Sequence, residues 1–140
     1  MLNTHAITAH PRRSLSTVKG AAIAALVILA FVFFGGPVTL GAHPFWGMKI
    51  AYFAIAAGVL MSTLATLAGQ RSQLQLVTFA TLLVISIAVT LYGKTQFAAS
   101  YAEDDVAGKL WFFGWIAGLA ASFSIITALI AIRLNRNKTA

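Results

Sequence analysis

Cysteine is absent from this 140-residue chain, and ionisable side chains are scarce. Without cysteine there is no disulfide, no thiolate metal site, no iron–sulfur cluster and no cysteine nucleophile. Asp and Glu together number three, and charged residues make up 9% of the sequence against 59% hydrophobic residues. Soluble domains contain about 25% charged residues. With a mean hydropathy of +0.85, the chain cannot cover its surface with solvated side chains, so lipid must cover much of it.

Four apolar stretches are long enough to cross a membrane, since a spanning helix needs roughly 20 mainly apolar residues. They cover about residues 18–40, 48–68, 74–92 and 110–134. No Asp, Glu, Lys, Arg or His lies inside any of their cores, so no buried charge opposes insertion. The sequence therefore predicts an all-α membrane protein, with a four-helix transmembrane bundle over residues 18–134. Basic tails at 1–17 and 135–140 flank it.

The net charge of +7 is distributed unevenly between the two ends of the predicted spans. One side carries Lys49, Lys94 and Lys109 together with all three acids. The other side carries no acid and seven basic residues: Arg12, Arg13, Lys19, Arg71, Arg133, Arg136 and Lys138. Because basic residues favour the cytoplasmic side, we expect both termini to be cytoplasmic in a bacterial inner membrane. These bases flank apolar spans and form no groove or helix face, so nucleic-acid binding is not expected.

The first apolar stretch also has the outline of a signal peptide. Arg12 and Arg13 precede it, and it ends in Gly35-Gly36-Pro37 before Ala42. Three phenylalanines make it unusually bulky, and Leu40 is a poor residue three positions before a cleavage point. We therefore expect the stretch to stay in the protein as its first span.

The second and fourth spans resemble one another at a distance of sixty residues. Identical residues recur in Lys49/Lys109, Phe53/Phe113, Ala57/Ala117, Gly58/Gly118 and Ser62/Ser122. Duplication and convergence under membrane composition both explain this pattern. If the spans are duplicated, the repeat is parallel, because both helices cross the membrane in the same direction.

Small residues form a stripe on each of these two spans. The stripes are Ala54, Gly58 and Ser62 on the second span and Gly114, Gly118 and Ser122 on the fourth. A spacing of four places each trio on one helix face, where small side chains let another backbone approach closely. The favoured hypothesis is packing of the two helices within one bundle. The alternative is that one stripe faces another subunit or a second copy of the chain.

Few residues are candidates for chemistry. His43 is a weak candidate haem ligand, since a haem that spans a bundle usually takes two axial ligands; a turn before the second span is the simpler interpretation. Glu103, Asp104 and Asp105 form the single acidic cluster and are weak candidates for a divalent cation site. We expect instead that Asp104 or Asp105 caps the fourth span and that Asp105 pairs with Lys109. We predict no cofactor.

Fourteen of the sixteen aromatic residues lie in the half of the spans that is predicted to face outward. The exceptions are Phe79 and Phe123. Aromatic belts ordinarily occur at both interfaces. We interpret most of the excess as interface anchoring by residues such as Trp46, Tyr52, Trp111 and Trp115. A lipid, quinone or partner contact in the outer leaflet is the alternative.

Catalysis and ion-coupled transport are not expected, because both generally need a titratable group at membrane depth. The favoured function is a small accessory or structural subunit of an inner-membrane complex. An alternative is a small transport or apolar-ligand-binding membrane protein. A weaker alternative is a redox helper that shares a haem or quinone site with a partner.

Overall fold

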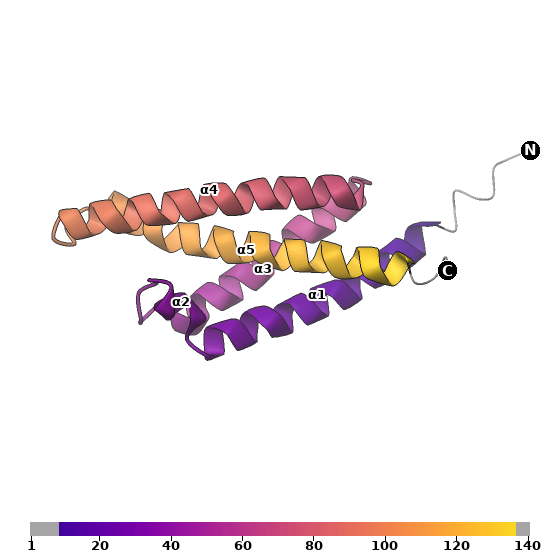
Figure 1. The fold of residues 1–140 in the computed structure, drawn as a ribbon, viewed down its shortest axis with the longest axis horizontal. Coiled ribbons are helices and arrows are strands. Elements are labelled where there is room, and N and C mark those ends of the chain that lie inside the picture. The colour runs from indigo at the N-terminus through magenta and orange to yellow at the C-terminus, as the bar shows by residue number, and fades with distance from the viewer. Residues whose placement is uncertain (1–8, 137–140) are drawn as a thin grey trace, which may run out of the picture.

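The computed structural model describes residues 9–136, with side chains from residue 15 onward. Within this range the chain forms five helices and no strand (Figure 1). They are α1 (Ala9–Phe33), α2 (Gly36–Thr39), α3 (Gly47–Leu67), α4 (Ser72–Ala99) and α5 (Asp105–Arg136). Lys138 and the side chains of Arg12 and Arg13 lie outside the described part.

Four of these helices are long and apolar enough to cross a membrane: Leu15–Phe33 within α1, and the whole of α3, α4 and α5. The predicted all-α architecture with four spans is therefore confirmed. We call the end of the bundle where α1 begins and α5 ends the terminal end. The opposite end, which carries the connections 40–46 and 100–104, is the loop end.

The first span is shorter than the predicted range of 18–40, because the helix ends at Phe33. Gly35 adopts a left-handed conformation, with φ of +77°, and this terminates α1 in a manner common at helix C-termini. Pro37, near the start of α2, has no N–H to continue the earlier helix. The apolar residues that follow therefore form the short helix α2, which lies across the loop end (Figure 1).

The α4–α5 hairpin is longer than the membrane is thick. These helices contain 28 and 32 residues, which corresponds to about 42 and 48 Å of helix. The hydrocarbon core of a bilayer is only about 30 Å thick. The hairpin accordingly extends past α2 and the start of α3 at the loop end (Figure 1).

Helix α5 is the centre of the bundle, because α1, α3 and α4 all pack against it. Helices α1 and α3 also pack against one another, whereas α4 has α5 as its main neighbour. The face of α5 that meets α1 and α3 is built from small residues around one aromatic ring, and Ala120, Phe123 and Ser124 are buried there. The core therefore depends on close approach of backbones, with a single large side chain at its middle.

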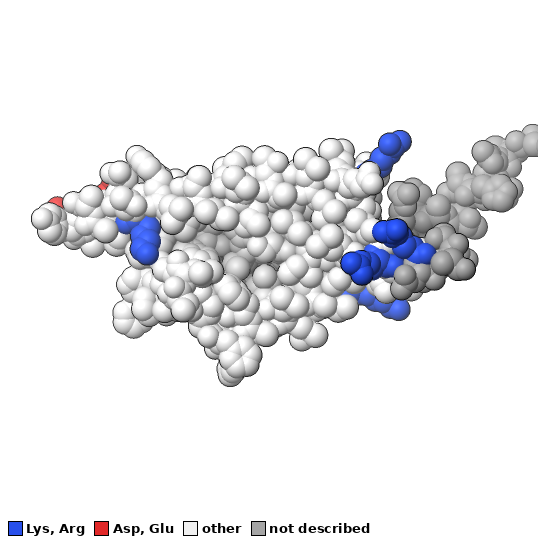
Figure 2. All heavy atoms as spheres, viewed as in Figure 1, with Lys and Arg blue, Asp and Glu red and all other residues white. Residues whose placement is uncertain are grey.

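Figure 2 shows how charge is distributed on one face of the molecule. Lys and Arg gather mainly at the terminal end, Asp and Glu appear only at the tip of the loop end, and the surface between them is uncharged. An uncharged band between two charged ends is the surface expected of a protein that spans a lipid bilayer.

Candidate functional site: an apolar groove between α1 and α4

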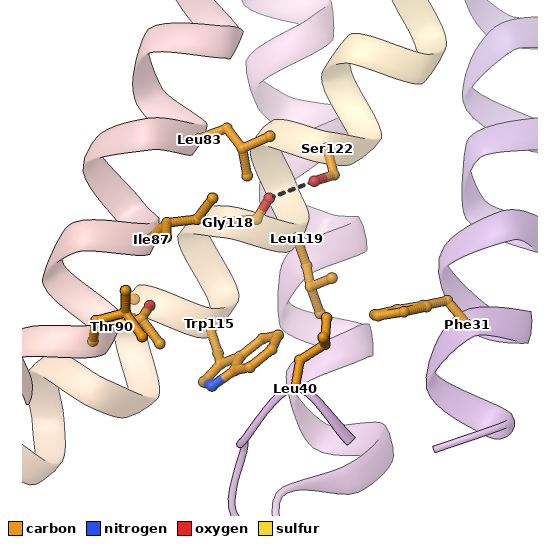
Figure 3. A pocket seen from close by; sticks show the side chains of 11 residues that line it. Phe31, Leu40, Leu83, Ile87, Thr90, Trp115, Gly118, Leu119 and Ser122 are labelled. Atoms are coloured by element: carbon orange, nitrogen blue, oxygen red, sulfur yellow. Dashed lines mark hydrogen bonds between the residues drawn. The ribbon is translucent and has the colours of Figure 1, made fainter. Parts of the chain in front are cut away.

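A groove of about 350 Å³ opens between α1 and α4 in the half of the bundle nearer the loop end (Figure 3). Binding pockets for small molecules commonly range from about 300 to 1,000 Å³. Helix α4 forms one wall, Phe31 and Leu40 form the other, and α5 forms the floor. The remaining lining residues are Leu83, Ile87, Thr90, Leu91, Gly114, Trp115, Gly118, Leu119 and Ser122.

The floor of the groove exists because Gly118 has no side chain. A Cβ added at Gly118 would lie 3.6 Å from the nearest atom, the Cβ of Ser86, which is an ordinary contact distance. One turn earlier α4 and α5 lie closer together, because Gly114, which also lines the groove, lies directly against Thr90. Two glycines of the same predicted stripe therefore have different surroundings. One holds α4 and α5 together, and the other leaves space above α5.

The rim of the groove faces away from the bundle. Ile87 is 50% exposed, Leu91 is 57% exposed and Leu40 is 69% exposed. In a bilayer, exposed apolar side chains at this level contact lipid. The groove is therefore open sideways to the membrane, and Figure 2 shows the surface recessed between α1 and α4.

The two hydroxyl groups that line the groove donate hydrogen bonds within their own helices. The hydroxyl of Thr90 donates to the carbonyl oxygen of Ser86 at 2.7 Å. The hydroxyl of Ser122 donates to the carbonyl oxygen of Gly118 at 2.9 Å. Serine and threonine commonly satisfy themselves in this way within helices. The indole Nε1 of Trp115 is buried and has no hydrogen-bond partner among the described residues, so a ligand in the groove does not reach it. The groove thus offers an apolar surface.

A lysine stands at the loop end of the groove. Lys94 follows Thr90 and Leu91 by one turn of α4, and its Nζ would lie only 2.5 Å from a Cβ added at Gly41. Gly41 has φ of +100°, a conformation that favours glycine. The ammonium group therefore reaches from α4 to the connection that follows Leu40.

An aromatic cluster fixes the loop end beside the groove. The rings of Trp46 and Trp111 meet edge to face with their centroids 4.7 Å apart, and Phe112 packs on Trp46 at 5.1 Å. Trp46 and Trp111 are half-buried, so these two predicted anchors pack on one another between α3 and α5. Tyr52 is 62% exposed on α3, as an anchor would be, whereas Trp115 lines the groove. Aromatic pairs of this geometry add about 0.5–1.5 kcal/mol beyond their burial.

His43 belongs to this aromatic cluster. Its Nδ1 accepts a hydrogen bond from the backbone N–H of Phe45 at 3.3 Å, and its ring stacks on that of Phe45. The Trp111 ring lies edge-on at 6.1 Å. The imidazole therefore closes the turn before α3, and its Nε2 is the ring nitrogen that a haem shared with a partner would have to use.

The acidic residues at the hairpin tip have local structural contacts. The backbone N–H of Ala107 donates to Oδ1 of Asp104 at 2.9 Å, so Asp104 caps α5. Asp105 pairs with Lys109 one turn further on, at 2.5 Å, and Glu103 is exposed. Within the described residues, no three His, Asp or Glu side chains lie together as a metal site would require.

The two predicted stripes lie in the bundle but do not face one another. Ala54, Gly58 and Ser62 are buried, and the hydroxyl of Ser124 is 3.3 Å from the carbonyl oxygen of Gly58. The stripe of α3 therefore packs on α5, through the face that carries Phe123 and Ser124. The stripe of α5 turns instead toward α4 and the groove. Helices α3 and α5 run in the same direction, as predicted (Figure 1).

A third stripe, on α1, was not predicted from the sequence. Ser16, Gly20, Ala24, Ile28 and Val32 are all buried, and a Cβ at Gly20 would lie 2.6 Å from the carbonyl oxygen of Thr127 in α5. The spacing of four from Ser16 to Ala24 was readable in the sequence. The groove itself was not, because it depends on how α1 and α4 diverge around α5.

The basic residues used to predict orientation lie at the terminal end. Lys19, Arg71, Arg133 and Arg136 belong to α1, the α3–α4 turn and the last turn of α5. A small polar pocket of about 40 Å³ lies at this end, lined by hydroxyl and amide side chains such as Thr66, Gln75 and Asn135. A cavity of this size is large enough for water. The terminal end thus has a polar pocket, in contrast to the apolar groove.

Comparison of the chain with protein-family models, with curated proteins and with solved structures finds no match.

Proposed function

We propose that this multi-pass membrane protein binds an apolar membrane component in the groove between α1 and α4. The observation that carries this proposal is a cavity of about 350 Å³ that has an open rim and a glycine floor. None of the described residues that line it is ionisable, so the proposed role is binding by contact rather than proton or electron chemistry. This corresponds to the second of the functions expected from the sequence.

We place the protein in a bacterial inner membrane with its terminal end in the cytoplasm. The support is the seven basic residues without acids on that side and the three acids on the other, together with the preference of basic residues for the cytoplasmic face. Basic residues near the membrane also contribute about 1 kcal/mol each by attraction to anionic lipid. The groove then lies in the outer leaflet.

The length of the groove favours a small ligand over a spanning helix. Its floor runs from Gly114 to Ser122, which is about 12 Å of helix. A partner helix that crossed the membrane beside α5 would need a surface along the whole hydrocarbon core of about 30 Å. A groove confined to one leaflet fits a lipid chain or another small apolar molecule of that leaflet.

The second candidate is the accessory subunit of a membrane complex, and the position of α4 supports it. This helix packs mainly on α5, and Val77, Val84 and Ile85 are more than half exposed on it. A helix with one neighbour leaves most of its surface for lipid, another subunit or a second copy. Purification in mild detergent separates these cases, because a defined larger complex supports the subunit role and a lone monomer opposes it.

Photolabelling tests the proposed binding function. The purified protein is reconstituted with a phosphatidylcholine that carries a diazirine on its acyl chain, and the labelled residues are identified by mass spectrometry. We expect labels on the groove walls, around Leu83 and Trp115. Gly118→Leu should remove them, because its side chain fills the space above α5.

The control variant is Ala56→Leu, which adds a leucine side chain at an exposed position of α3. It should leave the groove labels unchanged. Equal labelling of the groove walls in Gly118→Leu and the unmodified protein would contradict the proposal, as would labels spread evenly over all lipid-facing residues.

A further inference from the structure

We infer that the groove holds an acyl chain of an anionic phospholipid of the outer leaflet, and that Lys94 binds the phosphate of its headgroup. This inference rests on the proposed binding function and adds the chemical class of the ligand. It follows from the juxtaposition of an apolar groove that is one leaflet deep with an ammonium group at its loop end.

Lys94 lies at the loop end of the groove, close to both of its walls. Thr90 and Leu91 line the groove, and Lys94 lies one turn beyond them on the same helix. Its Nζ approaches Gly41, directly after the lining residue Leu40. The ammonium group therefore lies between the two walls where the groove ends, at the level expected for lipid headgroups.

No described residue neutralises the charge of Lys94. Among the described residues no carboxylate lies within 4 Å of its Nζ, and the single ion pair on the hairpin joins Lys109 to Asp105. Lys94 is exposed, so an anion from the surrounding membrane has access to it. Two other lysines occupy the loop end, but Lys109 is paired and Lys49 lies in the first turn of α3, outside the groove lining.

The depth of the groove matches one lipid chain. The groove floor is about 12 Å long, and half of the hydrocarbon core is about 15 Å thick. A chain laid on Gly118 from the loop end would thus reach nearly to the middle of the membrane.

A neutral apolar molecule would use the groove but not the lysine. A phosphodiester uses both, because its negative charge pairs with the ammonium group while its chain covers the apolar floor. Charge complementarity at the end of the groove therefore favours an anionic phospholipid over an uncharged ligand.

Lipid competition tests the inference. The protein is reconstituted in vesicles with equal parts of phosphatidylglycerol and phosphatidylcholine, and retained lipid is measured by native mass spectrometry after mild extraction. We expect the unmodified protein to retain phosphatidylglycerol preferentially. Lys94→Gln should lower that preference about fivefold, from the attraction typical of one basic residue for anionic lipid.

Two variants serve as controls. Lys49→Gln removes a charge at the loop end without touching the groove and should keep the preference. Lys94→Arg keeps the positive charge and should retain most of the preference for phosphatidylglycerol. An unchanged preference in Lys94→Gln, or an equal loss in Lys49→Gln, would overturn the inference.

The failure of this inference is distinguishable from failure of the proposed function. In one outcome, Gly118→Leu removes the acyl-chain photolabels but Lys94→Gln leaves the preference for phosphatidylglycerol unchanged. The groove then binds an apolar component, and an anionic phospholipid is the wrong ligand class. If the Gly118-dependent labels are themselves absent, both proposals are wrong. Retention of a spanning partner protein in the groove would likewise overturn both.

Discussion

Gly114 of α5 lies against the backbone of Thr90 in α4, so that a Cβ at Gly114 would be 3.0 Å from the amide nitrogen of Thr90. Apolar burial does not drive helix association inside lipid, and close packing takes its place. This contact is therefore part of what holds the α4–α5 hairpin together. Gly118, one turn away, has no comparable contact and leaves the groove open.

The difference between these two glycines predicts responses of different size to the same substitution. Gly114→Ala should lower the free energy of unfolding by about 1–3 kcal/mol, because the added methyl group overpacks the interface with Thr90. Gly118→Ala should change it by less than about 1 kcal/mol, since its Cβ meets only ordinary contacts and alanine favours the helix. Unfolding by SDS titration in mixed micelles measures both values. Equal destabilisation would show that Gly118 is also packed.

The contact between Gly58 and Phe123 predicts an energetic coupling between α3 and α5. A Cβ at Gly58 would lie 2.6 Å from the Phe123 ring, which is fully buried. Gly58→Ala should therefore destabilise the protein, and Phe123→Leu should partly relieve the clash. We expect the double variant to lose less free energy of unfolding than the sum of the two single losses, by at least about 0.5 kcal/mol. Gly58→Ala combined with Asp104→Ala, at the distant hairpin tip, should be additive.

The sequence predicted the number and type of the spans because hydrophobic length decides them locally. It also placed Ala54, Gly58 and Ser62 on one face, since a spacing of four is a property of a single helix. It did not predict that Phe123 would occupy the space above Gly58, or that Gly118 would floor a groove. Those outcomes depend on the rotation of α5 relative to three neighbours, and a single-helix pattern contains no information on it.

The same limit applies to the end of α1. Residues 34–40 are apolar enough to continue a span, and hydropathy alone extends the helix to Leu40. The turn is decided by the backbone of Gly35 and by Pro37, and its position determines that Leu40 reaches the groove. Glycine and proline between apolar residues were the readable signal for this boundary.

The hairpin tip provides a test of cap against cation site. Asp104→Ala should cost about 0.5–2 kcal/mol, because it removes the acceptor for the N–H of Ala107. Glu103→Ala should change stability by less than about 0.5 kcal/mol, as is usual for exposed positions. Both are measured by thermal unfolding in detergent, with and without added Ca²⁺. Stabilisation of the unmodified protein by Ca²⁺ that either substitution abolishes would support a cation site instead.

The uneven distribution of basic residues predicts the orientation of the bundle in the cell. Alkaline phosphatase fused after Ala140 should be inactive and green fluorescent protein at the same place fluorescent, because the positive terminal end stays in the cytoplasm. Phosphatase inserted after Ala102, in the α4–α5 turn, should be active. Replacing Arg71, Arg133 and Arg136 together with glutamine leaves fewer bases at the terminal end and should yield a mixed population in both assays. Phosphatase activity at the C-terminus of the unmodified protein would place the groove in the cytoplasmic leaflet, where Lys94 would face inner-leaflet lipids.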